Sequence, residues 1–302
     1  MNRLSSADTH PLLYIEARML NTLVKVMLKI LPNPLGIRLL RTVAGQTKPL
    51  PIPEEVQAML SKARTLTLGS CNNIRAWEWG HGPLVILVHG WGGQASQMAP
   101  LASEITRQGF RCVIFDVSGH GNAPENKTQW DYFIRDITDV TRSLNEKVYA
   151  YIGHSAGGMT MMAARKLGRI EAEKYMCICA PSYPFPPIRA VQQKLNPRKS
   201  LLDLYKTVIG GQFEIPWSEL ESSGYYSDPR ATLSLVYDEK DRFVPHTEGD
   251  KIHALCPGSS LFKTKDYGHT RILNAPELRK QALEFLTTDE FGQPSPSKHA
   301  AV

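Results

Sequence analysis

A serine between two glycines is the first group in this sequence whose type and spacing could do chemistry. Residues 153–157 read Gly-His-Ser-Ala-Gly, and they follow an apolar run from Val148 that is typical of a buried strand. Residues 159–167 then have the composition of a helix. A strand that turns abruptly into a helix leaves no room for bulky side chains, which explains the flanking glycines. The pattern predicts a strained turn that exposes the Ser155 hydroxyl at the sheet edge as a nucleophile.

A serine hydroxyl is a weak nucleophile at neutral pH, so it needs a base within hydrogen-bond reach and a group that orients this base. His269 and Asp241 each follow a predicted strand, and we assign them to these two roles. In a parallel sheet the loops after the strands emerge at one edge, where distant residues meet. Asp238 is a rival acid at the end of its strand, but Asp241 lies further into the loop and is favoured. Asp228 precedes the strand and is a poorer candidate.

A reaction that builds an oxyanion also needs preorganised hydrogen-bond donors. We expect one donor to be the backbone N–H of Ala156, which follows the serine at a helix N-terminus. The other is expected from residues 89–93 (His-Gly-Trp-Gly-Gly), at the N–H of Trp91. The Trp91 ring could instead form a wall of the acyl pocket. The chemistry needs no metal and no organic cofactor.

Other titratable residues in these loops are expected to have structural roles. His89, His120 and His154 should hydrogen-bond the loops to one another rather than transfer protons, and Asp116 is interpreted in the same way. The remaining histidines stand alone, which is usual for surface or packing residues.

The elements around these residues alternate between strand and helix. A hairpin is expected over residues 64–68 and 73–79. Further strands are predicted at 83–88, 111–116, 148–153, 175–180, 232–237 and 260–264. Helices are predicted at 53–63, 98–108, 128–144, 159–167, 247–255 and 276–286. This alternation predicts an α/β fold with a mostly parallel sheet covered by helices on both faces.

Five motifs in this order resemble the α/β-hydrolase superfamily over residues 66–286. They are residues 89–93, 116–121 (Asp-Val-Ser-Gly-His-Gly), 153–157, 241–245 (Asp-Arg-Phe-Val-Pro) and 268–269 (Gly-His). The resemblance implies a serine nucleophile, a histidine base and an aspartate at Ser155, His269 and Asp241. It does not define the substrate, because this fold carries many reactions.

The domain boundaries follow from composition. Residues 1–65 are predicted to be an N-terminal helical extension, 66–286 the α/β-hydrolase domain and 287–302 a flexible tail. Residues 182–227 interrupt the alternation with prolines and aromatics, where this superfamily inserts a cap. They are expected to form either a lid that contacts a hydrophobic substrate or a loop that packs on itself.

Residues 11–31 have the pattern of an amphipathic helix with a basic stripe that includes Arg18, Lys25 and Lys29. Such a helix could pack on its own domain, on a second subunit or on a membrane surface. Its charges interrupt the apolar run, so it is not expected to span a membrane, and no signal peptide is predicted.

The composition excludes several other classes of protein. A net charge of +6 without a Lys/Arg run argues against nucleic acid as a partner. Five cysteines without a paired framework favour a reducing cytoplasm, and their spacing does not fit a metal site.

The sequence therefore predicts a cytoplasmic serine hydrolase that cleaves small carboxylic esters with an apolar portion through a Ser-His-Asp triad and an acyl-enzyme. A lipase or lysophospholipase at a membrane surface, and a thioesterase or lactonase, are the alternatives. A non-catalytic binding protein that kept the fold is less favoured.

Overall fold

The computed structural model describes residues 11–71, 73–123, 125–227 and 232–288, with side chains described from residue 21 onward. Within these residues eight strands form a sheet in the order β1-β2-β4-β3-β5-β6-β7-β8. The strands are β1 (Arg64–Leu68), β2 (Ile74–Trp79), β3 (Leu84–Val88), β4 (Arg111–Phe115), β5 (Val148–His154), β6 (Ala172–Ile178), β7 (Thr232–Asp238) and β8 (Ser260–Thr264).

In this order the strands from β4 to β8 are all parallel. Strand β2 pairs antiparallel with β4, and β1 forms an antiparallel hairpin with β2 at the edge of the sheet. Ile86 at the centre is in register with Val113 on one side and Tyr151 on the other. Because parallel strands end at one edge, the loops after β3, β5, β7 and β8 all leave the sheet on the same side. The predicted α/β fold is thus confirmed.

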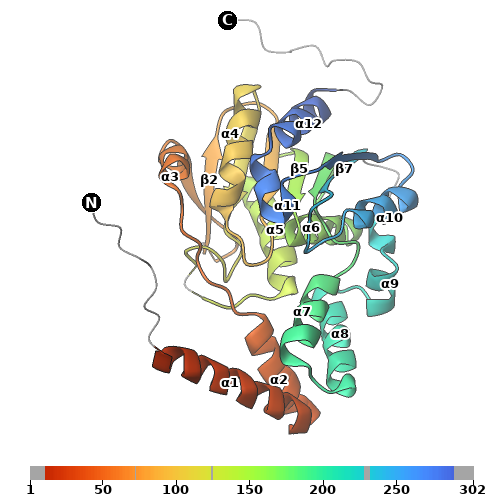
Figure 1. The fold of residues 1–302 in the computed structure, drawn as a ribbon. Coiled ribbons are helices and arrows are strands. Elements are labelled where there is room, and N and C mark those ends of the chain that lie inside the picture. The colour runs from red at the N-terminus through yellow and green to blue at the C-terminus, as the bar shows by residue number, and fades with distance from the viewer. Residues whose placement is uncertain (1–10, 72, 124, 228–231, 289–302) are drawn as a thin grey trace, which may run out of the picture.

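Helices cover both faces of the sheet, as expected (Figure 1). The helices are α1 (Pro11–Ile30), α2 (Asn33–Ala44), α3 (Glu54–Leu60), α4 (Ala99–Arg107), α5 (Trp130–Leu144), α6 (Ala156–Lys166), α7 (Phe185–Leu195), α8 (Lys199–Phe213), α9 (Trp217–Glu221), α10 (Thr247–Leu255), α11 (Gly268–Arg271) and α12 (Pro276–Thr287). Short 3-10 turns lie at Ala95–Met98, Gly224–Tyr226 and Ile272–Asn274.

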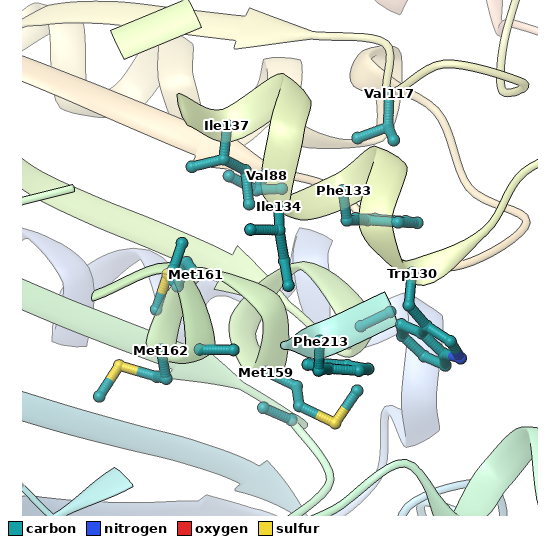
Figure 2. Packing of buried hydrophobic residues seen from close by; sticks show 14 of the residues in the cluster. Val88, Val117, Trp130, Phe133, Ile134, Ile137, Met159, Met161, Met162 and Phe213 are labelled. Atoms are coloured by element: carbon teal, nitrogen blue, oxygen red, sulfur yellow. The ribbon is translucent and has the colours of Figure 1, made fainter. Parts of the chain in front are cut away.

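Side chains that alternate along each central strand pack into two separate hydrophobic cores, one on each face of the sheet. In β3, Ile86 and Val88 pack in a core with α5, α6 and α8, whereas Val85 and Leu87 pack with α3, α4 and α12. Figure 2 shows Val88 among side chains of α5 in the first core. A strand buried on both faces needs a continuous apolar run, which is why β3 carries one.

The N-terminal helices and residues 182–227 lie together. Figure 1 shows α7 and α8 beside α2, at the end of the molecule away from α12, and α2 contacts α8 while α1 contacts α7. Arg198, in the loop between α7 and α8, donates hydrogen bonds to the Lys29 carbonyl (3.3 Å) and to Asn33 Oδ1 (2.7 Å). These bonds tie the corner between α1 and α2 to the residues expected to form a cap.

The helices α2, α7, α8 and α9 were not predicted individually, and the stretch 182–227 is helical rather than irregular. Prolines obscure this pattern, because α2 and α7 each carry proline in the first turn, where its missing N–H costs nothing. The apolar spacing of α7 at Phe185, Ile188, Val191 and Leu195 is nevertheless helical.

In the part of the chain that the structure describes, no helix is long and apolar enough to cross a membrane. The predicted tail, residues 287–302, lies outside the described residues except for its first two. All five cysteine thiols are free.

Candidate active site

Ser155 lies in a tight turn between β5 and α6. Its backbone has φ 52° and ψ −118°, a conformation that L-residues rarely adopt, and its N–H donates to the Ile178 carbonyl at 2.8 Å. The glycine two residues later allows close approach, since a Cβ on Gly157 would lie 2.4 Å from the His89 carbonyl oxygen. The strained turn predicted from the sequence is present.

The structure brings together the three residues that were predicted to act as nucleophile, base and acid. His269 Nε2 lies 3.0 Å from Ser155 Oγ, and His269 Nδ1 lies 2.6 Å from Asp241 Oδ2. The Asp241 side chain is buried, whereas Ser155 and His269 are partly open to solvent. Neutral His269 with its proton on Nδ1 can therefore donate to Asp241 and accept the serine proton at Nε2.

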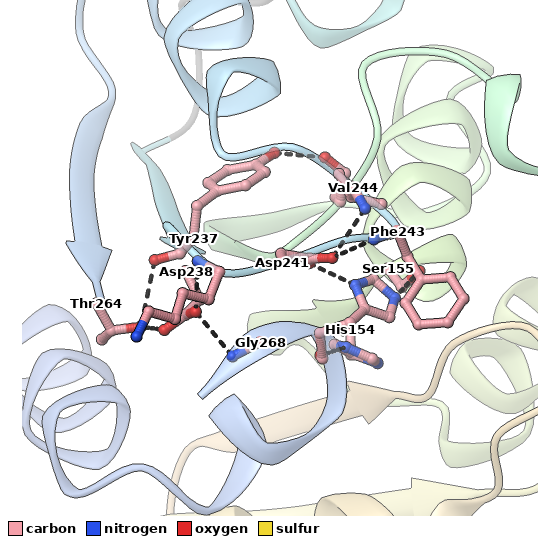
Figure 3. A network of polar contacts seen from close by, with 12 residues as sticks. His154, Ser155, Tyr237, Asp238, Asp241, Phe243, Val244, Thr264 and Gly268 are labelled. Atoms are coloured by element: carbon pink, nitrogen blue, oxygen red, sulfur yellow. Dashed lines mark hydrogen bonds and ion pairs between the residues drawn. The ribbon is translucent and has the colours of Figure 1, made fainter. Parts of the chain in front are cut away.

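The second carboxylate oxygen of Asp241 also accepts hydrogen bonds. This oxygen, Oδ1, accepts the backbone N–H groups of Phe243 (2.8 Å) and Val244 (2.9 Å), which fixes the orientation of the side chain. Figure 3 shows Asp241 on the Ser155 side of this polar network.

The rival acid, Asp238, faces away from the imidazole. Its carboxylate accepts backbone N–H groups of Lys240 (2.9 Å), Tyr267 (3.0 Å) and Gly268 (2.7 Å), as well as the Thr264 hydroxyl (2.6 Å). Burial disfavours the charged carboxylate, yet these hydrogen bonds outweigh it and lower the pKa of Asp238. Asp238 thus fastens together the two loops that carry Asp241 and His269.

Two histidines hydrogen-bond the loops near the site, as expected. The buried His89 donates from Nδ1 to the Gly90 carbonyl and accepts the Val117 N–H at Nε2 (3.1 Å). His120 Nε2 accepts the Gly92 N–H at 3.0 Å. Burial lowers the pKa of His89 and lowers that of His120 to about 3, so both rings are neutral near pH 7.

His154 and Asp116 also have structural contacts. His154 Nε2 donates to the His269 carbonyl at 2.8 Å, and burial lowers the pKa of His154 to about 3. Asp116 Oδ1 accepts the Ala95 N–H at 2.7 Å. None of these groups is placed to take the proton of Ser155.

The two expected oxyanion donors lie beside the serine. Trp91 and Ala156 line the same cavity as Ser155, and neither backbone N–H donates to another residue in the described part of the chain. Ala156 begins α6, where the helix leaves its first N–H groups unsatisfied. The Trp91 ring stacks on Phe133 (ring centroids 5.9 Å) and packs on Trp130 (4.5 Å), so the ring forms part of the cavity wall.

A cavity of about 530 Å³ opens above Ser155 and His269. Its walls are mostly apolar and come from the sheet edge, from α2 (Val43, Ala44) and from α7 (Val191, Leu195). Among the described residues that line it, none is acidic. Such a volume and lining suit a small molecule with an apolar portion.

The sequence did not indicate that α2 contributes to this cavity, whereas α7 belongs to residues 182–227, for which a lid over the substrate was one of two expectations. The helical spacing of α7 was a usable signal, but nothing in the sequence of α2 indicates that it lies against the sheet edge. Phe243 is another lining residue that was not singled out, and its side chain is 67% exposed.

Cys179, Asp241 and His269 carry potential ligand atoms within 4.8 Å of one another. Burial raises the pKa of the Cys179 thiol well above its usual value, so the thiol stays protonated and is a poor ligand. Asp241 and His269 are already hydrogen-bonded to each other. The donor set therefore fits a hydrogen-bonded triad better than a metal centre.

Comparison with known proteins agrees with this geometry. The family model for the alpha/beta hydrolase fold matches residues 83–198, which include the nucleophile turn. The solved structure of Est1E from Butyrivibrio proteoclasticus with bound ferulic acid superposes with a TM-score of 0.59 at 15% identity, covering 72% of this chain and 97% of the other. A monoacylglycerol lipase of Paleococcus ferrophilus gives 0.53 at 17% identity, covering 70% and 98%. The chain therefore has the α/β-hydrolase fold.

The curated relatives align with a smaller part of this chain than these two solved structures do. A serine hydrolase-like protein of Dictyostelium discoideum is 27% identical over 124 residues, which are 38% of this chain and 34% of that protein. A non-heme chloroperoxidase of Kitasatospora aureofaciens is 24% identical over 55% of this chain and 60% of its own length. The chain thus spans less than two thirds of either relative.

Proposed function

We propose that this protein is a serine hydrolase that cleaves carboxylic esters with an apolar portion through an acyl-enzyme intermediate. One observation carries the proposal, namely the hydrogen-bonded chain from Ser155 through His269 to Asp241 beneath an apolar cavity. A serine, a neutral imidazole and a buried carboxylate in this order are the parts that acyl transfer requires.

In the first half of the reaction, His269 Nε2 takes the Ser155 proton as Oγ attacks the ester carbonyl. Asp241 holds the imidazole in the correct tautomer and stabilises its charged form. The protonated His269 then gives this proton to the leaving alcohol, which leaves an acyl group on Ser155. Water attacks the acyl group by the same route and restores the serine.

The N–H groups of Trp91 and Ala156 would hold the oxyanion that forms in both halves. Each preorganised donor of this kind contributes about 3 kcal/mol to the stability of the transition state. The position of Ala156 at the start of α6 supports its role, because the helix dipole favours negative charge there.

The apolar walls of the cavity support an ester with an apolar acyl or alcohol group. Est1E, which was solved with bound ferulic acid, and the monoacylglycerol lipase share the fold. Thioesters and lactones pass through the same tetrahedral intermediate and remain alternatives, and so does an ester drawn from a membrane surface. The free thiols support a reducing, cytoplasmic location as part of the proposal.

Turnover of p-nitrophenyl butyrate tests the proposal. The variant Ser155→Ala should lose the nucleophile and about 10⁶-fold in kcat, with an unchanged circular dichroism spectrum. Ser61→Ala is the matched control, since Ser61 is exposed and remote from the cavity. Near-wild-type turnover by Ser155→Ala would refute the mechanism, and activity on thioesters or lactones alone would redirect the substrate class.

A further inference from the structure

The corner between α1 and α2 carries large apolar side chains that the rest of the described chain leaves exposed. Four of the seven large apolar side chains that are exposed among the described residues lie on these two helices. They are Leu23 (55% exposed), Val26 (49%), Ile30 (71%) and Leu35 (53%). The spacing of three and four residues puts the first three on one face of α1. We call these four side chains the apolar corner.

A cavity of about 450 Å³ lies next to the apolar corner, between α2 and residues 127–129. It begins at Pro34, which is adjacent to Leu35 in the chain. Arg38 is one helical turn further along α2, on the same side as Pro34. The cavity therefore begins in the same first turn of α2 that carries Leu35.

The cavity is strongly basic. Three cationic side chains line it, Arg38, Arg41 and Lys127, and none of its described lining residues is acidic. Throughout the described chain, no carboxylate lies within ion-pair distance of these three side chains. Three uncompensated cations around a concave site attract an anion.

Polar side chains surround the cations of this cavity and hold Arg41 in place. Arg41 donates from Nε to Gln129 Oε1 at 3.2 Å, and Gln129 Oε1 also accepts from Gln212. The guanidinium is thus held in one orientation with donors to spare. The Thr128 hydroxyl, in the cavity wall, is buried with a residue exposure of 1% and has no hydrogen-bond partner among the described residues.

We propose that this face docks on a membrane that contains anionic phospholipid. The apolar corner enters the boundary between headgroups and acyl chains, and the phosphate of one lipid occupies the cavity between Arg38, Arg41 and Lys127. Amphipathic helices bind membranes by this combination of buried apolar area and attraction to anionic headgroups. Anchoring of the corner by Arg198 keeps the two parts of the surface in a fixed relation.

The docking face is close to the active-site cavity. Helix α2 lines both cavities. Arg38, Arg41 and Thr42 line the basic cavity, and Val43 and Ala44 at the end of the helix line the cavity above Ser155. Docking would therefore hold the active site near the lipid surface. The binding itself does not depend on catalysis, so it stands or fails separately from the proposed hydrolysis.

Vesicle co-sedimentation of the full-length protein tests the proposal. The protein should bind vesicles of equimolar phosphatidylcholine and phosphatidylglycerol, and bind vesicles of phosphatidylcholine alone much more weakly. The double variant Arg38→Gln/Lys127→Gln should lose about 30-fold in affinity, since each cation near an anionic surface contributes about fivefold. Its matched control is Lys62→Gln/Lys265→Gln, which removes the same charge from exposed lysines outside the cavity.

The apolar part is tested in the same assay. Ile30→Ser/Leu35→Ser should lose binding, whereas Leu50→Ser/Leu255→Ser should retain it, because these leucines are also exposed but lie outside the apolar corner. Circular dichroism and hydrolysis of p-nitrophenyl butyrate report whether each variant is folded.

Three results would overturn the proposal. Equal loss in the site variants and their controls would mean that net charge or general hydrophobicity alone drives binding. Binding of glycerol 3-phosphate by calorimetry without vesicle binding would make the cavity a site for a free phosphate ester. A dimer in sedimentation velocity that Ile30→Ser/Leu35→Ser dissociates, without vesicle binding, would make the apolar corner a contact between two copies of this chain.

Discussion

Asp241 and Asp238 lie three residues apart at the end of β7, yet their surroundings give them different functions. Asp241 contacts the imidazole of His269, and Asp238 contacts backbone N–H groups of the neighbouring loops. The sequence favoured Asp241 because of its place in the loop, and the geometry gives the reason.

Asparagine at each position should separate these functions. Asp241→Asn should lower kcat by about 10⁴-fold, because the amide favours the wrong imidazole tautomer. Asp238→Asn should lower kcat far less but reduce the free energy of unfolding, because it weakens hydrogen bonds to a charged acceptor. Steady-state kinetics and urea unfolding of both variants give the comparison, and a larger kinetic loss in Asp238→Asn would move the assignment of the acid.

At the scale of single elements, the turn between β5 and α6 depends on the absence of side chains. A Cβ on Gly157 would lie 2.4 Å from the His89 carbonyl oxygen and 2.5 Å from that of Val88. Backbone atoms on the neighbouring strand cannot move aside without disturbing the sheet.

Gly157→Ala should therefore destabilise the protein and lower its esterase activity at the same time. Gly211→Ala makes the same chemical change in α8, where the added Cβ meets open space, and it should raise the free energy of unfolding by up to about 1 kcal/mol. Thermal unfolding and turnover of p-nitrophenyl butyrate measure both effects. A Gly157→Ala variant as stable and active as the wild type would show that the turn can relax.

Some of the helices and strands could be predicted from the sequence and others could not. The strands and the helices between them carry buried apolar runs and clear periodicity, so the mostly parallel sheet and the loops with Ser155, Asp241 and His269 followed from them. The helices α2 and α7 were missed because proline in a first turn looks like a helix breaker. The contribution of α2 to the cavity depends on long-range packing, which no local pattern records.

Across the whole molecule, buried neutral histidines connect stability to pH. His120 and His154 have pKa values lowered to about 3 by burial, against 6.5 in an unfolded chain. Between these values the unfolded chain binds protons that the folded chain does not, so the free energy of unfolding falls as the pH falls. This contribution is fully present above about pH 6.5 and is lost progressively below it.

Urea unfolding at pH 7.5 and 5.5 should accordingly show lower stability at the lower pH. His120→Gln should make the difference smaller, because an amide carbonyl can still accept the Gly92 N–H but does not titrate. Equal dependence on pH in the wild type and in His120→Gln would show that His120 does not contribute.

The central claim is that Ser155 is a nucleophile activated by His269 and Asp241. Reaction with a fluorophosphonate probe, followed by peptide mass spectrometry, tests it most directly because only an activated serine reacts. We expect a single modification at Ser155 in the wild type, loss of labelling in Ser155→Ala and strongly slowed labelling in Asp241→Asn. An unlabelled folded wild type, or labelling at another serine with Ser155 unmodified, would contradict the account.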